Sequence, residues 1–332
     1  MHAVQSNFAD FDAEIVRTFT IAAFSRYNEV PYHNVYHAFS VLQGCYSLIT
    51  TTEMMGKLTH VEKYAMLVAG VGHDMGHGGI NTTFLTATES DLALMYNDKS
   101  PLENMHSRET FTVMKQDQCN VLACLQDQRK DARRIIVDAI IGTDMAFHKH
   151  HMDQLSARSA IDMDSSIDRE MMLALLVHLS DVGATSFGWV DCVRWGRMVM
   201  TEFQTQVYRE GENNIPISGY MDLGSTNQKD AFVKSQMGFI DFVLLPFFLL
   251  FPPHIPEMKV YSNQLAKNRK GYEQVQSGKK KLPKASKADD IKIAWSVNVG
   301  KNTYPGGAIP LAKLAHVTPT TVLCSKGAVD KG

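Results

Sequence analysis

Hydrophobic residues recur every three or four positions through most of this 332-residue chain. That spacing places them on one face of an α-helix. Phe11, Ile15 and Phe19 begin the pattern, which is longest at residues 133–141, 169–179 and 189–208. Alternating patterns bounded by turn residues, which would indicate β-strands, are nearly absent between residues 8 and 274. We therefore predict an all-α fold, a compact domain of many helices.

The helical pattern stops near residue 275. Residues 276–287 read QSGKKKLPKASK, and no sustained period returns before the end of the chain. We predict that residues 1–275 form the domain and that residues 276–332 form a flexible basic C-terminal tail, either disordered or artificial in origin. Contact of this tail with a membrane or a nucleic acid is the alternative.

The charge is distributed unevenly between these two parts. Residues 276–332 hold ten Lys and three Asp, a net charge of +7, so residues 1–275 carry a net charge of −9. Surfaces that bind nucleic acids are basic because they displace the counterions of the phosphates. The acidic domain therefore argues against a nucleic-acid partner. It suits a small anionic substrate only where bound metal ions supply positive charge.

Cysteine usage and hydropathy indicate the compartment. Five cysteines are scattered without a CxxC pair, and an odd number in a chain of this length argues against a disulfide framework. The longest hydrophobic run, residues 242–251, has ten residues and contains Pro246, whereas a membrane span needs about 18–20. We expect a buried helix there, no transmembrane segment, no signal peptide and a cytoplasmic, reducing location.

Two histidines stand four residues apart near the N-terminus. Pro31, a residue type favoured in the first turn of a helix, precedes His33 and His37. Residues at positions i and i+4 of a helix share one face, so we predict that both imidazoles point the same way. Two exposed surface histidines are the alternative to a pair of metal ligands.

Further His and Asp residues end hydrophobic stretches. His73 and Asp74 follow residues 65–72, and Asp181 follows residues 171–179. Burying these side chains without partners would cost several kcal/mol, which metal coordination removes. An oxygen-rich set of this kind suits a two-metal hydrolase better than a closed structural zinc site. A phosphate ester would be a natural substrate, and a histidine would protonate its leaving oxygen.

Six segments carry a resemblance to a known family. They are HNVYH at 33–37, HDMGHGGIN at 73–81, LALMYND at 92–98, LENMH at 102–106, TDM at 143–145 and SQMGFID at 235–241. Together they resemble the catalytic domain of class I 3′,5′-cyclic nucleotide phosphodiesterases, within the HD-domain metallo-phosphohydrolases, over residues 8–273. The resemblance implies that a hydroxide bridging two metal ions hydrolyses cAMP, cGMP or both to the 5′-monophosphates, which would end cyclic nucleotide signals.

The resemblance also implies a role for each matching residue. His37, His73, Asp74 and Asp181 would hold Zn²⁺, and Asp74 would bridge to a second ion, Mg²⁺ or Mn²⁺. His33 would be the general acid that protonates the departing O3′, and Glu202 would orient it. The other matches would hold metal-bound waters in place: His77, Asn81, Glu103, His106, Thr143 and Asp144.

A third group of residues would bind the nucleotide. The resemblance implies that the Gln236 amide hydrogen-bonds the purine, that Phe239 stacks on it and that Val199 forms the opposite wall, while Tyr32 lines the pocket near the metals. Ala184 stands where adenosine-selective members carry an asparagine. Because its side chain neither donates nor accepts a hydrogen bond, this departure favours use of cGMP or of both nucleotides over strict selectivity for cAMP.

Two other functions remain open at this point. One is an HD-domain phosphohydrolase that acts on another nucleotide, and the other is a non-catalytic cyclic nucleotide sensor. The segment around Gln236 favours a single cyclic nucleotide as the small-molecule substrate, and the complete ligand set with its acid favours catalysis. The resemblance also implies regulatory domains upstream in a longer protein.

Overall fold

A computed structural model describes residues 11–284 of the chain. Residues 1–10 and 285–332 lie outside the described part, and with them most of the predicted tail. Between residues 11 and 284 the regular elements are helices, and no β-strand occurs. This confirms the predicted all-α fold.

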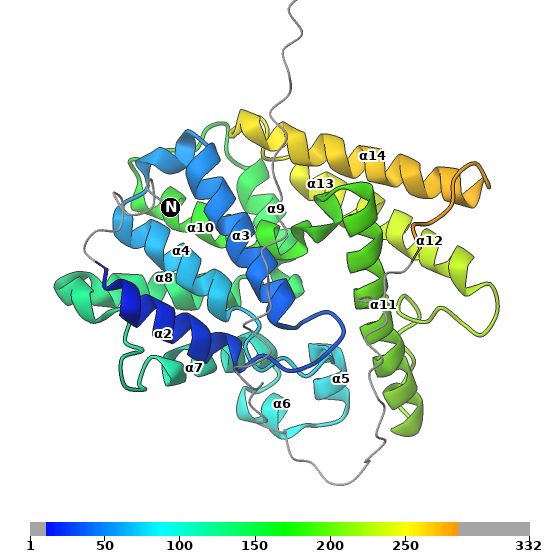
Figure 1. The fold of residues 1–332 in the computed structure, drawn as a ribbon, viewed down its shortest axis with the longest axis horizontal. Helices are drawn as coiled ribbons and strands as arrows, with labels where there is room; N and C mark the ends of the chain where they lie inside the picture. The colour runs from blue at the N-terminus through cyan, green and yellow to red at the C-terminus, as the bar shows by residue number, and fades with distance from the viewer. Residues whose placement is uncertain (1–10, 285–332) are drawn as a thin grey trace, which may run out of the picture.

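The helices follow one another through connections of different lengths, the longest at residues 114–128 and 213–227 (Figure 1). In chain order the α-helices are α2 (Ala13–Phe24), α3 (Val35–Thr51), α4 (His60–Gly72), α5 (Thr82–Ala87), α6 (Asp91–Met95), α7 (Pro101–Val113), α8 (Arg129–Ile141), α9 (His148–Ser156), α10 (Ser166–Val182), α11 (Trp189–Glu212), α12 (Gln228–Phe239), α13 (Leu245–Phe248) and α14 (Lys259–Gln276). The three segments with the longest predicted helical pattern are parts of α8, α10 and α11.

Local sequence sets where three of these helices begin. The Asn34 side chain accepts hydrogen bonds from two backbone N–H groups of α3. Thr59 and Glu62 form a reciprocal capping box at the start of α4, and Asn81 caps α5. Caps of this kind satisfy backbone N–H groups that have no partner within the helix. The starts of α3, α4 and α5 are therefore defined by adjacent residues.

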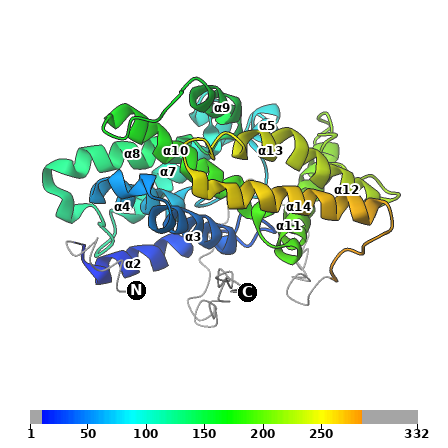
Figure 2. The same ribbon diagram turned by 90° about the horizontal axis from the view of Figure 1, so that it is seen from above.

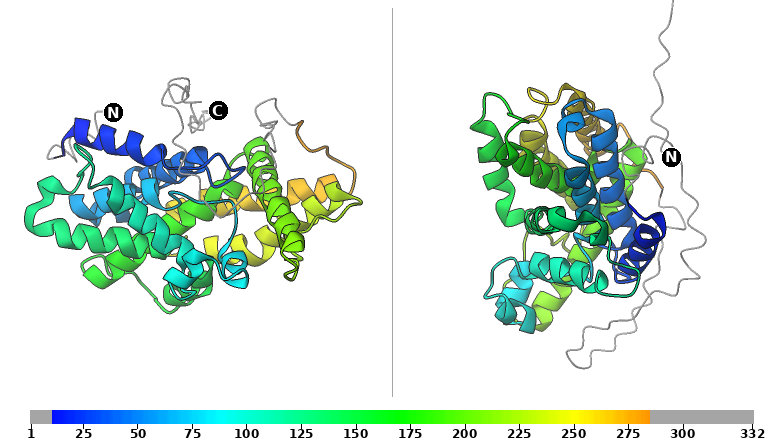
Figure 3. Two further views of the ribbon diagram at one scale, coloured as in Figure 1. Left: turned by 90° about the horizontal axis from the view of Figure 1, so that it is seen from below. Right: turned by 90° about the vertical axis from the view of Figure 1, so that its left-hand side faces the viewer.

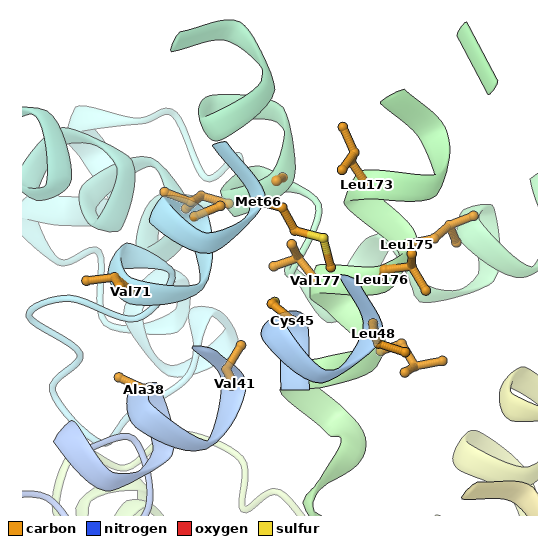
Figure 4. Close-up of a cluster of buried hydrophobic side chains, with 14 of the residues drawn as sticks. Ala38, Val41, Cys45, Leu48, Met66, Val71, Leu173, Leu175, Leu176 and Val177 are labelled. Atoms are coloured by element: carbon orange, nitrogen blue, oxygen red, sulfur yellow. The ribbon is translucent and has the colours of Figure 1, made fainter. Parts of the chain in front are cut away.

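Helices α3, α4 and α10 pack around a shared hydrophobic core (Figure 4). Cys45, Met66 and Val177 come one from each helix, and all three are fully buried. Burial of a Val or Met side chain stabilises a fold by roughly 1.5–3 kcal/mol. The same three helices carry the predicted metal ligands near their ends, so core packing holds those ends at fixed positions.

Helix α11 stands between the two ends of an elongated molecule. Figure 3 shows α2, α4, α7 and α8 at one end and α12 with the last turns of α14 at the other. Figure 2 shows α14 passing beside α11 and α12. After α14 the chain returns to α11, where Arg197 donates to the Pro283 carbonyl at 2.6 Å and Lys280 Nζ lies 3.9 Å from the centroid of a Trp189 ring.

The hydrophobic run at residues 242–251 is only partly buried. A π-helical turn (Ile240–Leu244) continues α12 and leads into α13. Phe247, Phe248 and Phe251 are buried in the core, but Phe242 is 83% exposed. The prediction of one buried helix is therefore wrong for the first part of the run.

The segment from α12 to α13 also meets a test for membrane spans. Gln228–Phe248 has 21 helical residues; the mean hydropathy of its most hydrophobic 18-residue window is 1.4, and 39% of that window is buried. Within residues 11–284 it is the single continuous helix long and hydrophobic enough to cross a bilayer, a test that core helices of other folds also meet. The expected absence of a transmembrane segment stays a prediction.

Candidate metal and nucleotide site

Four predicted ligands from three helices meet at one point. His37 lies in the first turn of α3, His73 and Asp74 directly follow α4, and Asp181 lies near the end of α10. One ligand atom from each of the four lies within 4.8 Å of those of the others. His37 Nε2 is 2.9 Å from Asp181 Oδ1 and 3.2 Å from Asp74 Oδ2, which is also 3.2 Å from His73 Nε2. The structure brings these side chains together as predicted.

The donor set fits a divalent cation. His73 Nδ1–H donates to the Gly70 carbonyl at 3.0 Å, which turns Nε2 toward the two carboxylates; on metal binding Nε2 would release its proton and coordinate the ion. Asp74 Oδ2 is buried and, apart from the close approach of the two imidazole nitrogens, has no well-aligned hydrogen-bond partner among the described residues. A buried carboxylate oxygen without a partner is costly, and coordination by an ion between His37, His73 and Asp181 would remove that cost.

The charges within this cluster are strongly coupled. Burial lowers the pKa of His73, but the neighbouring Asp74 and Asp181 carboxylates reverse this and raise it well above its usual value. Burial raises the pKa of Asp74, but the charges of His73 and His33 and its hydrogen bonds bring it well below its usual value. The carboxylates are therefore ionised at neutral pH, as metal ligands must be.

His33 does not share a helical face with His37. Asn34 caps α3, so the helix begins at Val35 and His33 stands before it in a bent segment. The Asn34 side chain also donates to the carbonyls of Val30 and Pro31. The prediction that a helix starting near Pro31 carries both histidines was wrong, because the capped helix begins two residues after His33.

Glu202 holds His33 at the edge of the cluster. One carboxylate oxygen contacts His33 Nδ1, and the other accepts from the backbone N–H groups of Tyr32 at 2.8 Å and His33 at 3.1 Å. Burial lowers the pKa of His33, but Glu202, Asp74 and Asp181 raise it overall to about 9. Burial raises the pKa of Glu202, but His33 lowers it overall to about 2. The pair therefore holds a proton on the imidazole.

His77 packs against His33. Their ring centroids are 3.9 Å apart, and the Gly79 N–H donates to His77 Nδ1 at 3.0 Å. Burial and the charge of His33 lower the pKa of His77 to about 3. His77 is therefore neutral beside the protonated His33.

Several predicted water-holding residues lie on the far side of Asp74. His106 Nδ1–H donates to the Met75 carbonyl at 2.9 Å, and its Nε2 is 3.5 Å from Asp74 Oδ1. Glu103, one turn earlier on α7, has a buried carboxylate oxygen without a hydrogen-bond partner among the described residues. Burial and the charge of Asp144 raise the pKa of Glu103 to about 8. The unpartnered oxygen is suited to a second ion or its waters.

Thr143, Asp144 and Asn81 make contacts of their own. Thr143 Oγ1 donates to the Ile140 carbonyl, and Asp144 accepts from Ser100 Oγ at 2.7 Å. Asn81 Oδ1 caps α5 and accepts from Gln206 Nε2 at 2.9 Å, while its amide donates to the Tyr220 hydroxyl. The structure thus shows Asn81 joining α5 to α11 and to the following connection.

The predicted nucleotide residues come from α11, α12 and the turn after α10. Gln236 and Phe239 lie one turn apart on α12, as predicted, and Val199 lies on α11. Ala184 is buried in a 3₁₀ turn (Gly183–Ser186) that directly follows α10. The Tyr32 ring contacts that of His37, with centroids 4.7 Å apart.

Two neighbouring residues of α11 connect the metal cluster with Gln236, and the sequence did not single them out. The Trp195 ring lies 6.2 Å from that of His37 and 5.7 Å from that of Tyr32. The next residue, Gly196, lies against the Gln236 carboxamide. Gly196 precedes Val199 by three positions, so shared helical spacing was the one available signal.

A surface groove of about 730 Å³ lies between α7, the connection after it and α8. Phe111 and Arg133 line it, with the guanidinium carbon of Arg133 3.8 Å from the Phe111 ring centroid. None of its lining residues belongs to the predicted site. The groove is therefore separate from the metal cluster.

Comparisons with known proteins agree with this geometry. Residues 32–265 match the family described as 3′5′-cyclic nucleotide phosphodiesterase. The 3′,5′-cyclic-nucleotide phosphodiesterase regA of Dictyostelium discoideum is 32% identical over 262 residues, which cover 76% of this chain and 32% of that protein. The dual specificity calcium/calmodulin-dependent 3′,5′-cyclic nucleotide phosphodiesterase 1B of Bos taurus is 33% identical over 219 residues, or 66% of this chain and 40% of that protein.

Solved structures give the same result. The phosphodiesterase domain of the Salpingoeca rosetta rhodopsin phosphodiesterase superposes with a TM-score of 0.78 at 29% identity, covering 83% of this chain and 84% of that one. The chain spans about a third to two fifths of the length of the curated relatives described above. On the match over residues 32–265 and the shared fold, the chain belongs to the 3′,5′-cyclic nucleotide phosphodiesterase family.

Proposed function

We propose that the chain hydrolyses 3′,5′-cyclic nucleotides to 5′-monophosphates. The observation that carries the proposal is the placement of a protonated His33, held by Glu202, beside the cluster of His37, His73, Asp74 and Asp181. Hydrolysis of a cyclic phosphodiester needs charge stabilisation at phosphorus and a proton for the leaving oxygen. Ions held by the cluster would supply the charge stabilisation, and the adjacent His33 would supply the proton.

The metal cluster is the proposed place for two ions. Zn²⁺ suits the mixed nitrogen and oxygen donors of His37, His73, Asp74 and Asp181. Mg²⁺ or Mn²⁺ suits the oxygen-rich side of Asp74 that faces His106 and Glu103. When bound, such ions polarise phosphoryl oxygens and lower the pKa of water.

His33 acts as the general acid in this proposal. Its Nδ1 is held by Glu202, so Nε2 is the nitrogen left to donate a proton to the departing O3′. The resulting neutral imidazole is reprotonated from solvent, because Glu202 keeps its pKa high. His77, which stays neutral, adds no competing charge beside it.

The purine is proposed to bind between Phe239 and Val199, with Gln236 reading its edge. No hydrogen-bond partner of the Gln236 amide occurs within the described residues, and Ala184 offers no polar side-chain atom. An amide that is not tied by the protein presents either its oxygen or its NH₂ group to a base. We therefore propose that both cAMP and cGMP are substrates.

Regulation is proposed to involve parts of a longer protein. The relatives are two and a half to three times as long as the matched region, and one of them is named as calcium/calmodulin-dependent. Within residues 11–284 none of the four cysteines forms a disulfide, which supports a cytoplasmic, reducing location. Cys324 lies outside the described residues.

The test is to incubate the purified chain with cAMP and with cGMP in the presence of Mg²⁺ or Mn²⁺. Separation of the products should show the 5′-monophosphates, and their absence from both reactions would refute the proposal. The matched variant is His33→Ala, which should keep its metal content but lose turnover by roughly 10²–10⁴-fold. Near-normal turnover in that variant would remove His33 from the role of general acid.

A further inference from the structure

Gly196 leaves room for the Gln236 carboxamide inside the protein. It lies two turns into the 24-residue helix α11 and faces α12. A Cβ atom at this position would stand 2.5 Å from Gln236 Oε1 and 2.9 Å from its Cδ. Both distances are far below van der Waals contact, so no other residue fits here while the amide keeps its place.

The position of the Gln236 carboxamide is set by packing and not by hydrogen bonds. Gln236 is 4% exposed, yet no hydrogen bond of its side chain occurs within residues 11–284. Phe232, one turn earlier on α12, is the other side chain close to Gly196, at 3.4 Å from the same Cβ position. The direction of the amide therefore depends on the space that Gly196 provides.

Neither the stability nor the backbone conformation of α11 requires a glycine in this place. Glycine within a helix is less stable than alanine because it loses more conformational freedom on folding. The backbone at Gly196 is ordinary α-helix, so no left-handed conformation requires a glycine. Gly211, near the end of the same helix, serves as a matched comparison, because a Cβ atom there would meet no other atom within 4 Å.

We propose that Gly196 is a positioning residue for purine binding, which acts on the substrate through Gln236. The inference rests on the proposed function, in which Gln236 binds the purine. Trp195, directly before Gly196, contacts the rings of Tyr32 and His37. One turn of α11 therefore supports the metal end of the site with Trp195 and the purine end with Gly196.

The test compares Gly196→Ala with Gly211→Ala. Because the amide is the far end of a flexible side chain, it should swing away from the new methyl group while the fold is kept. The KM values for cAMP and cGMP should each rise about tenfold or more, as expected for loss of one buried hydrogen bond to the base. The kcat values should change less than about threefold, and the melting temperature should stay or rise, because alanine favours the helix.

Gly211→Ala should keep both KM values within about twofold and share the neutral or stabilising effect on melting. A third comparison adds Gly196→Ala to Gln236→Ala. Because the shortened side chain no longer occupies the space, the second substitution should leave KM unchanged. If Gly196 only stabilised the fold, Gly196→Ala would instead lower the melting temperature and kcat, both in the unaltered chain and in the Gln236→Ala background.

Unchanged KM values in Gly196→Ala would overturn the inference, as would an equal rise of KM in the Gln236→Ala background. Failure of the proposed function looks different, since the unaltered chain would then release no 5′-nucleotide. In that case the unaltered chain and the same four variants are compared by equilibrium dialysis with cAMP and cGMP. If Gly196→Ala binds the nucleotides more weakly than Gly211→Ala does, the positioning role is supported. If the two variants bind them equally, it is rejected.

Discussion

The charge on Glu202 controls when His33 carries its proton. In the proposed reaction His33 donates only in its protonated form, so we expect activity to be lost as the pH rises through the pKa of His33. That pKa is about 9, raised by Glu202 and by two carboxylates of the metal cluster. Bound cations would offset the two cluster carboxylates, which leaves Glu202 as the main source of the rise.

Glu202→Gln keeps the shape of the side chain and removes its charge. The pKa of His33 should fall, because burial is then opposed by less negative charge. We expect the alkaline limb of the kcat/KM–pH profile to move to lower pH by about one unit or more. Thr201→Val, on the exposed face of the same helix, is the control. An alkaline limb at the same pH in Glu202→Gln would show that His33 is not the group whose proton is required.

The chemistry of single residues could largely be predicted from sequence, but their partners could not. Histidines and aspartates at the ends of hydrophobic stretches have few uses other than metal binding or catalysis, so their types and spacing indicated the cluster. The double contact of Glu202 with the Tyr32 and His33 backbone joins residues about 170 positions apart. Gly196 has no side chain, and only the position of the Gln236 carboxamide points to the role proposed for it.

At the level of elements, the cap of α3 determines where His33 lies relative to His37. Asn34 accepts from the first N–H groups of α3 and donates to the carbonyls of Val30 and Pro31. It therefore joins the helix to the bent segment that carries His33. The sequence predicted a helix that carries His37, but it contains no direct information on the side-chain hydrogen bonds that set where the helix begins.

Asn34→Ala should therefore affect both stability and turnover. Loss of a helix cap costs about 1 kcal/mol in the free energy of unfolding. The matched variant is Asp12→Ala, which removes the cap of α2, a helix without any predicted site residue. Urea unfolding should show a larger loss for Asn34→Ala, whose side chain also donates to the Val30 and Pro31 carbonyls, while kcat falls at least severalfold in Asn34→Ala alone. Equal kcat values would mean that the cap does not position His33.

The π-helical turn between α12 and α13 gives a second reason why hydrophobic periodicity does not fully predict which residues are buried. Its residues are as hydrophobic as those of a buried helix, yet Phe242 points outward while Phe247 and Phe248 enter the core. Which face of such a run is covered depends on the helices that pack on it. That information lies in other parts of the chain.

Across the whole molecule, the four predicted ligands join the ends of α3, α4 and α10, the helices that form the central core (Figure 4). An ion at this point binds the folded protein and has no comparable site in the unfolded chain. Its binding would therefore add to global stability, apart from the catalytic role proposed for it. At a free ion concentration 100 times the Kd the gain is about 2.7 kcal/mol.

Removal of metal by a chelator should lower the melting temperature by several degrees and abolish turnover, and added Zn²⁺ with Mg²⁺ should restore both. Asp181→Asn removes one ligand charge, so its melting temperature should respond much less to the chelator. Asp168→Asn is the matched control, because Asp168 lies on the same helix but pairs with Arg158 at 3.0 Å. That variant should keep the full response to the chelator even if its melting temperature is lower at the outset. An equal response in Asp181→Asn and the unaltered chain would place the ion elsewhere, because a site that includes Asp181 cannot lose this ligand without losing affinity.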